Sequence, residues 1–320
     1  MPSNWIFWII FNVFVLLMLT LDLGVFHRKK HVVSFREAIG WTIAWMGLAA
    51  VFAVLIYFFG HTMVGHAKVS NSQLSLEFIT GYVIEQSLSV DNLFVFLLIF
   101  RYFAVPKHYQ HDVLFWGVLG ALVMRAMFIF AGVTLLDKFH WVIYIFGAIL
   151  IYSGIKLLRQ YGAKIHPETN PLLRLFRRLF RVTRDYEGEK FFVRRGAVRY
   201  ATPLALVLIV VETTDLLFAV DSIPAVLAVT RQPFIVYTSN VFAIMGLRSL
   251  FFALSGMIET FHFLHYGLSI ILILIGVKML VSSYVEVPTT LALGAVAGVL
   301  VLSIVLSLIF PAPKHPHGGS

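Results

Sequence analysis

The sequence predicts an all-α membrane protein that crosses the bilayer about nine times. The chain is 59% hydrophobic and only 13% charged, whereas soluble domains are about 25% charged. Its apolar runs are continuous over about 20 residues, the length of a helix that crosses a bilayer. They lack the strict alternation of apolar and polar residues that strands of a transmembrane barrel require.

Nine hydrophobic spans follow one another along the chain: 5–26, 37–60, 75–102, 112–136, 140–159, 200–229, 233–257, 262–281 and 290–310. The first is not expected to be a cleaved signal peptide, because its basic cluster, residues 27–31, follows the apolar run instead of preceding it. Lys and Arg gather on alternate connections, while the opposite side carries only Lys68, Lys138 and Arg231. The positive-inside rule therefore predicts an external N-terminus and a cytoplasmic C-terminus.

The connection 160–199 holds ten Lys and Arg residues. The run Pro171–Arg181 places arginines at helical spacing on one face and Leu and Phe on the other, which predicts an amphipathic helix over 171–182. Such a helix suits the surface of an anionic membrane, although it could instead pack on its own protein. The net charge of +9 belongs to this face of the membrane and does not indicate nucleic-acid binding.

Spans 3–5 and 6–8 resemble each other. Four matches occur in the same order: Glu85-x5-Asp91-Asn92 with Asp215-x5-Asp221-Ser222, Arg125 with Arg248, Asp137–Trp141 with Glu259–Phe263, and Gly154–Leu158 with Gly276–Leu280. Three crossings reverse the chain, so the second copy enters from the opposite side as an inverted repeat. The expected divisions are 1–74, repeat 1 at 75–159, the basic loop 160–199, repeat 2 at 200–281, and 282–320.

Five acidic residues lie well inside spans 3 and 6, where each charge costs about 2.5–3.5 kcal/mol on insertion scales. Together with nearby amide and hydroxyl oxygens they form a set that suits Mg²⁺, Ca²⁺ or Mn²⁺; protons are the next choice. The set is Glu85, Asp91, Asn92, Glu212, Asp215, Asp221 and Ser222. An alternative is that the acids form structural ion pairs with Arg125 and Arg248, although two arginines cannot neutralise five acids. For these two arginines, the sequence leaves two roles open: structural ion pairing and gating of the transport path.

Helix geometry places Glu212 and Asp215 on one face. Asp215 and Asp221 differ by about 240° on a regular helix, so one site could collect both only if the helix unwinds. Pro224 favours such unwinding, because it cannot donate to the carbonyl of Val220. In span 3, Ser87, Ser89 and Asn92 can compete for backbone hydrogen bonds.

The chain has no cysteine, which excludes disulfides and thiolate metal sites. It also lacks a phosphate-binding loop with its lysine, a nucleophile elbow and an HExxH motif. We therefore expect neither an enzyme nor a prosthetic group. The excess of acid within the spans argues against amino acids or tellurite oxyanion as the substrate.

Several motifs resemble the TerC family of integral membrane proteins, close to its Alx branch. They are Leu21–Arg28, Glu85-x-Ser-Leu-x-Val-Asp91-Asn92-x-Phe94, Phe191–Arg194, Tyr200–Pro203, Phe218–Ala225 and Thr238–Arg248. The resemblance implies a multi-pass protein of the bacterial inner membrane, linked to manganese efflux and historically labelled for tellurite resistance. The leading hypothesis is a Mn²⁺ exporter that exchanges with protons, with Asp91 and Asp221 as central ligands. The alternative is a metal-binding membrane scaffold that helps to metalate or assemble other proteins.

Overall fold

The computed structural model describes residues 5–27, 34–65, 69–139, 141–159, 171–196, 198–255, 263–282, 284–285 and 287–310; the side chains of residues 22–27, 91 and 171 lie outside this description. The described helices are α1 (Trp5–His27), α2 (Phe35–Val64), α3 (Asn71–Tyr102), α4 (Lys107–Lys138), α5 (Val142–Arg159), α6 (Pro171–Leu179), α7 (Pro203–Leu227), α8 (Pro233–Leu254), α9 (Leu264–Val281) and α10 (Thr289–Ile309). The strands are β1 (Arg181–Val182), β2 (Phe192–Arg195) and β3 (Val198–Ala201).

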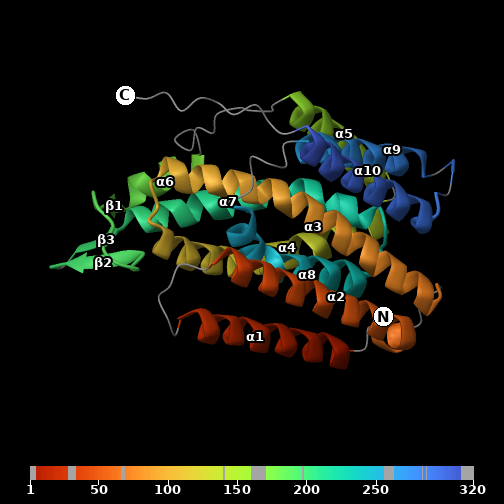
Figure 1. Ribbon diagram of the computed structural model, residues 1–320, viewed down its shortest axis with the longest axis horizontal. Helices are drawn as coiled ribbons and strands as arrows, with labels where there is room; N and C mark the ends of the chain where they lie inside the picture. The colour runs from red at the N-terminus through yellow and green to blue at the C-terminus, as the bar shows by residue number, and fades with distance from the viewer. Residues whose placement is uncertain are drawn as a thin grey trace.

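Every helix except α6 belongs to one bundle (Figure 1). Eight are long and apolar enough to cross a membrane, and α1 adds an apolar stretch at Trp5–Leu21. The predicted all-α, multi-pass fold is therefore confirmed. Helix ends extend beyond the predicted apolar spans where a cap is present. Thus α3 begins at Asn71, because the Ser70 hydroxyl accepts a hydrogen bond from the Gln73 backbone N–H at 3.2 Å.

The two predicted repeats meet where α5 crosses α9. A Cβ at Gly154 would lie 2.8 Å from the carbonyl oxygen of Ser269, and one at Gly276 would lie 2.7 Å from the carbonyl oxygen of Gly147. In the repeat, Gly154 corresponds to Gly276 and Gly147 to Ser269, each 122 residues further along the chain. The repeat therefore relates the two contacts to each other. Residue numbers rise along α5 as they fall along α9, so the helices are antiparallel, as inverted repeats require. The aligned residues 256–262 and 140 lie outside the described part of the chain.

Helices α3, α4, α7 and α8 form the interior of the bundle, and nearly every residue of α8 is buried. Aromatic side chains pack helix α1 against α2 and α8. The Trp8 ring centroid lies 5.2 Å from that of Phe234, and the Phe11 centroid lies 5.5 Å from that of Phe52. The Tyr237 hydroxyl also donates to Asn12 Oδ1 at 2.8 Å. A polar contact within an aromatic interface therefore fixes α1 against α8.

The basic segment forms a small subdomain at one end of the bundle (Figure 1). Besides the expected helix, which is α6, it contains a sheet in the order β1-β3-β2, with β1 parallel and β2 antiparallel to β3; the sequence analysis missed these strands. The Tyr186 hydroxyl donates to the carbonyl of Phe103 at 2.7 Å. Burial raises the pKa of Tyr186 above its ordinary value, so the hydroxyl keeps the proton that ties the subdomain to the end of α3.

Candidate functional site

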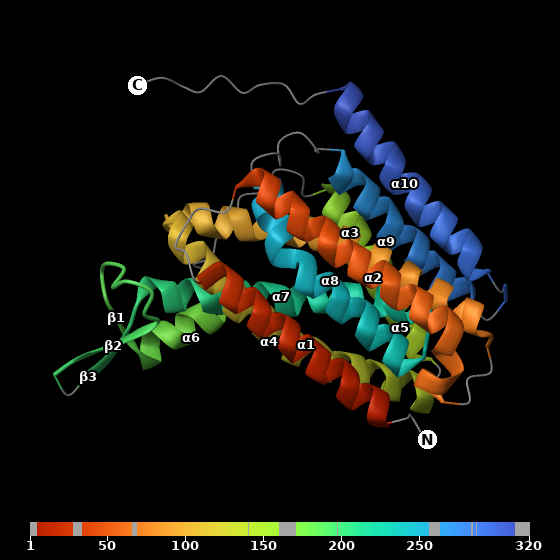
Figure 2. The ribbon, with the colours of Figure 1, turned by 60° about the horizontal axis from the view of Figure 1, so that its bottom comes forward.

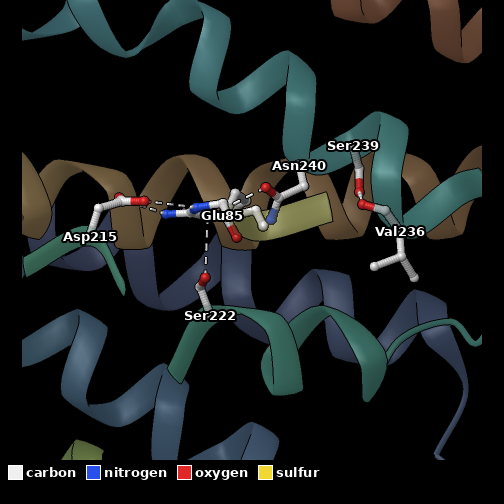
Figure 3. Close-up of polar contacts among 7 residues, drawn as sticks. Glu85, Asp215, Ser222, Val236, Ser239 and Asn240 are labelled. Atoms are coloured by element: carbon white, nitrogen blue, oxygen red, sulfur yellow. Dashed lines mark hydrogen bonds and ion pairs between the residues drawn. The ribbon is translucent and has the colours of Figure 1, made fainter. Parts of the chain in front are cut away.

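The guanidinium of Arg125 on α4 joins four buried polar side chains, which are labelled in Figure 3. It forms an ion pair with Glu85 of α3. It also donates to Asp215 of α7, with Nη2 3.2 Å from Oδ1 and Nε 3.5 Å from Oδ2. Nη1 lies 3.2 Å from the hydroxyl of Ser222 and 3.5 Å from Oδ1 of Asn240 on α8. Arg125, Glu85 and Asp215 are 2%, 0% and 4% exposed, so this is a fully buried charge cluster.

The regular geometry of α7 decides which of its polar residues join the cluster. Asp215 and Ser222 are seven residues apart, which returns them to one face after two turns. Asp221 is rotated by about 240° from Asp215 and contacts another helix. The condition of local unwinding is not met: α7 is one continuous α-helix that contains Pro224, and α3 is continuous as well. A single site therefore does not collect both Asp215 and Asp221.

Asp221 faces α5 instead of Arg125. The hydroxyl of Ser153 donates to Asp221 Oδ1 at 2.6 Å, and the positive charge of Lys156 acts on the same carboxylate. The sequence had indicated Asp221 as a central ligand. The structure places it in a second polar group between α5 and α7, partly open at the surface of the bundle.

Glu212 lies one turn before Asp215, and its carboxylate lies against α4. A Cβ at Gly120 would come within 2.1 Å of Glu212 Oε1, so the missing side chain of Gly120 provides the space for this acid. Glu212 is half-buried, and the nearby charge of Asp215 acts on it. Because their charges repel, these two acids favour a proton or a cation between them.

One face of α3 carries buried polar atoms that need a partner. Glu85 Oε2, Ser89 Oγ and Asn92 Nδ2 have no hydrogen-bond partner within the described part of the chain. Residues at i, i+4 and i+7 share a helix face, so these atoms follow one line along α3. Buried polar atoms without partners are rare, and a line of them beside a charge cluster suits water, a proton or a cation.

Asp91 and Arg248 are the remaining predicted site residues. The side chain of Asp91 lies outside the described residues. Arg248 is buried on α8 and does not take part in the contacts of Arg125. Within the described ranges, no three Asp, Glu or His side chains come together as a preformed metal site.

Sequence reasoning missed three residues of this region. The amide oxygen of Asn240 on α8 accepts from Arg125 on α4, a hydrogen bond between helices; its polar side chain inside an apolar span is the available signal. Ser153 and Gly120 gave no such signal, because a serine or a glycine in a membrane helix is common at helix contacts.

A family model described as "Integral membrane protein TerC family" matches residues 70–315. The chain belongs to the TerC family. The match covers every helix from α3 to α10, and with them every residue that contacts Arg125. The resemblance drawn from the motifs is therefore confirmed, as is the multi-pass membrane location.

Several curated proteins are similar to this TerC-family chain over almost its whole length. An uncharacterized membrane protein, STKORF319, of Myxococcus xanthus is 50% identical over 94% of this chain and 92% of its own. The putative membrane-bound redox modulator Alx of Escherichia coli K12 is 44% identical over 93% of this chain and 92% of its own. An uncharacterized membrane protein of Rickettsia bellii is 38% identical over 94% and 97%. No solved structure matches the chain.

Proposed function

We propose that this chain exports a hard divalent cation, Mn²⁺ above all, in exchange for protons. The observation that supports this most is the convergence of Glu85 from the first repeat and Asp215 from the second on one buried positive charge. The oxygens of Ser222 and Asn240 complete the group. Carboxylate, hydroxyl and amide oxygens are the ligands of hard cations. In this proposal Arg125 and the transported cation occupy the same position between the two carboxylates, one after the other.

Charge balance supports the exchange of a metal ion for a proton. With Arg125 between them, two carboxylates and one guanidinium leave one negative charge, which one bound proton neutralises. With a divalent cation between them instead, the two carboxylates are neutralised without that proton. A net charge at this depth is costly, so entry of the cation favours withdrawal of Arg125 and release of the proton.

The remaining acids would serve the path to and from this centre. Glu212 lies one turn along α7 from Asp215, and the polar atoms of Ser89 and Asn92 extend from Glu85 along α3. Asp221, which accepts a hydrogen bond from Ser153, would act as a separate binding position beside α5. Asp91, with Arg248 on α8, completes the set that the sequence indicates. Each of these positions lies within the membrane-spanning part of the bundle.

The choice of manganese and of the bacterial inner membrane comes from the family. The Alx relatives carry the name putative membrane-bound redox modulator. Because this chain has no cysteine, a redox role would not involve thiols of its own. Movement of a redox-active metal ion such as manganese out of the cytoplasm would influence the redox balance without them.

Purified protein in liposomes tests the proposal. External Mn²⁺ is added, the metal is followed with a trapped indicator dye, and the lumenal pH is followed with a second dye. The wild-type chain and a Glu187→Gln control, altered in the exposed pair with Arg195, should move Mn²⁺ with a counterflow of protons. Asp215→Asn should lower the rate at least tenfold.

Two results would contradict the exporter. Wild-type protein that binds Mn²⁺ but gives no flux would favour the metal-binding scaffold. Flux at an unchanged rate in both Asp215→Asn and Glu85→Gln would show that the buried cluster is only a structural ion-pair network.

A further inference from the structure

The helix α6 has three distinct faces. At 100° per residue, Leu173 and Phe176 point to one side; Leu173 is buried and Phe176 packs against the core. Leu175 and Leu179 share a second face and are 51% and 69% exposed. The third face carries the exposed arginines Arg174, Arg177 and Arg178, and the exposed Arg181 follows on β1. The inner face explains how α6 is held, whereas Leu175 and Leu179 stay exposed in the described part of the chain.

The apolar surface of α6 continues onto the neighbouring sheet. The Phe176 and Phe180 ring centroids are 4.6 Å apart, and Phe180 lies 5.9 Å from Phe192 of β2. Phe180 is 38% and Phe192 50% exposed. Scattered exposed hydrophobic residues are common on soluble surfaces, but a contiguous group marks an interaction surface. We call this group, Leu175, Leu179, Phe180 and Phe192, the apolar ridge.

Strong positive charge surrounds the apolar ridge. Residues 171–199 contain nine Lys and Arg and three Asp and Glu, a net charge of +6. Arg195 forms an ion pair with Glu187, and the arginines of α6 are exposed. Leucine and phenylalanine side chains suit the acyl-chain region of a bilayer, and arginines beside them suit its negatively charged headgroups. The combination therefore matches the surface of an anionic bilayer.

The connection to the bundle keeps the apolar ridge near the membrane boundary. Strand β3 ends at Ala201, two residues before α7 begins at Pro203, and β1 pairs directly with β3. Tyr186 bonds the end of α3. The subdomain therefore lies at the ends of the membrane helices, on one side of the bundle in both ribbon views (Figures 1 and 2).

We propose that this subdomain is an anionic-lipid binding surface. The apolar ridge enters the boundary between headgroups and acyl chains, and the arginines of α6 bind phospholipid phosphates. The occupant is a phospholipid with net negative charge, such as phosphatidylglycerol. An acidic protein segment would match the arginines equally well. Lipid is favoured because the subdomain is tied to two membrane helices, so the bilayer is already beside it. This inference does not depend on the proposed transport.

The chain contains no cysteine, so single cysteines can be introduced into the full-length protein and spin-labelled without background. The test variants are Leu175→Cys and Leu179→Cys. Lys190→Cys, on the exposed loop before β2, is the control. Each is reconstituted into nanodiscs of phosphatidylcholine alone or mixed equally with phosphatidylglycerol. Collision rates of the label with oxygen, which enters lipid, and with a nickel chelate, which stays in water, report its depth.

In the anionic discs, labels at 175 and 179 should collide more with oxygen than with nickel, while the label at 190 should show the opposite. Changing Arg174, Arg177, Arg178 and Arg181 to Gln should return the label at 179 to water. Nickel access at 175 and 179 equal to that at 190 would overturn the proposal. Protection of the labels from both reagents would also overturn it, because that result indicates a contact with protein. So would an equal label depth in both lipid mixtures, with and without the arginines, because lipid charge would then have no role.

Discussion

At the scale of single residues, Arg125 should matter to folding as well as to transport. Removing one partner of a buried ion pair leaves an uncompensated charge and costs about 3–5 kcal/mol. We expect Arg125→Gln to lower the free energy of unfolding by that amount, because Glu85 and Asp215 stay buried. Unfolding by SDS in mixed micelles measures it. Arg195→Gln, from an exposed pair, should cost at most about 1 kcal/mol.

A second substitution separates charge from packing at this position. Adding Glu85→Gln to Arg125→Gln removes one of the stranded charges and should recover part of the lost stability. If the double variant is less stable than Arg125→Gln alone, the side chains contribute through packing or hydrogen bonds, and the charge argument is wrong.

Gly120 is expected to control the position of Glu212. A Cβ at Gly120 would lie 2.1 Å from Glu212 Oε1, so Gly120→Ala must push the carboxylate away from α4. Mn²⁺ flux in liposomes should fall severalfold, and the shorter acid in Gly120→Ala/Glu212→Asp should restore part of it. Gly47→Ala is the control, because a Cβ there meets nothing within 4 Å. Equal flux in all three variants would exclude a role for this fit.

The identity of the polar residues was predictable at this scale, but their grouping was only partly so. Charge within apolar spans singled out Glu85, Asp215 and Arg125, and all three meet. Asp221 also stood out, yet helix rotation turns it toward Ser153. Rotation predicts which residues diverge, but it does not predict which neighbouring helix each residue faces. That depends on packing between spans far apart in sequence.

At the scale of helices, close crossing of α5 and α9 depends on glycine. Gly154→Ala and Gly276→Ala each place a Cβ within 3 Å of a backbone carbonyl on the other helix, which forces the helices apart. Each should cost about 1–3 kcal/mol, typical of overpacking, and the costs should be similar because the repeat makes the sites equivalent. Thermal unfolding followed by size-exclusion chromatography measures the loss.

Gly298→Ala on α10 is the matched control, since a Cβ there meets nothing within 4 Å. It should leave stability unchanged or slightly raise it, because alanine favours a helix. A loss at Gly298 as large as that at Gly154 would mean that helix propensity or insertion, not the crossing, determines the result.

The helices themselves followed from hydropathy, because a bilayer demands long apolar segments. Two local features did not. The strands of the basic subdomain are two to four residues long and mostly exposed, so no alternating pattern marks them. Pro224 lies one turn before the end of α7 at Leu227. Near a helix end, one lost backbone hydrogen bond does not require the helix to unwind.

At the scale of the whole molecule, the nine crossings that the sequence predicts would place the two ends of the chain on opposite sides of the membrane. Helix α1 begins at the end opposite the basic subdomain, whereas α10 ends on the subdomain's side (Figure 2). The concentration of arginine in that subdomain then assigns its side to the cytoplasm by the positive-inside rule. The orientation proposed here therefore has an external N-terminus and a cytoplasmic C-terminus.

Labelling of single cysteines in cells tests this orientation, because the parent chain has none and gives no background signal. Arg231→Cys lies in the exposed connection between α7 and α8, and Arg194→Cys lies on β2. A membrane-impermeant maleimide should label residue 231 in cells with a permeable outer envelope but an intact inner membrane. Residue 194 should react only after that membrane is broken. The reverse pattern would place the basic subdomain outside, and the direction assigned to cation export would reverse with it.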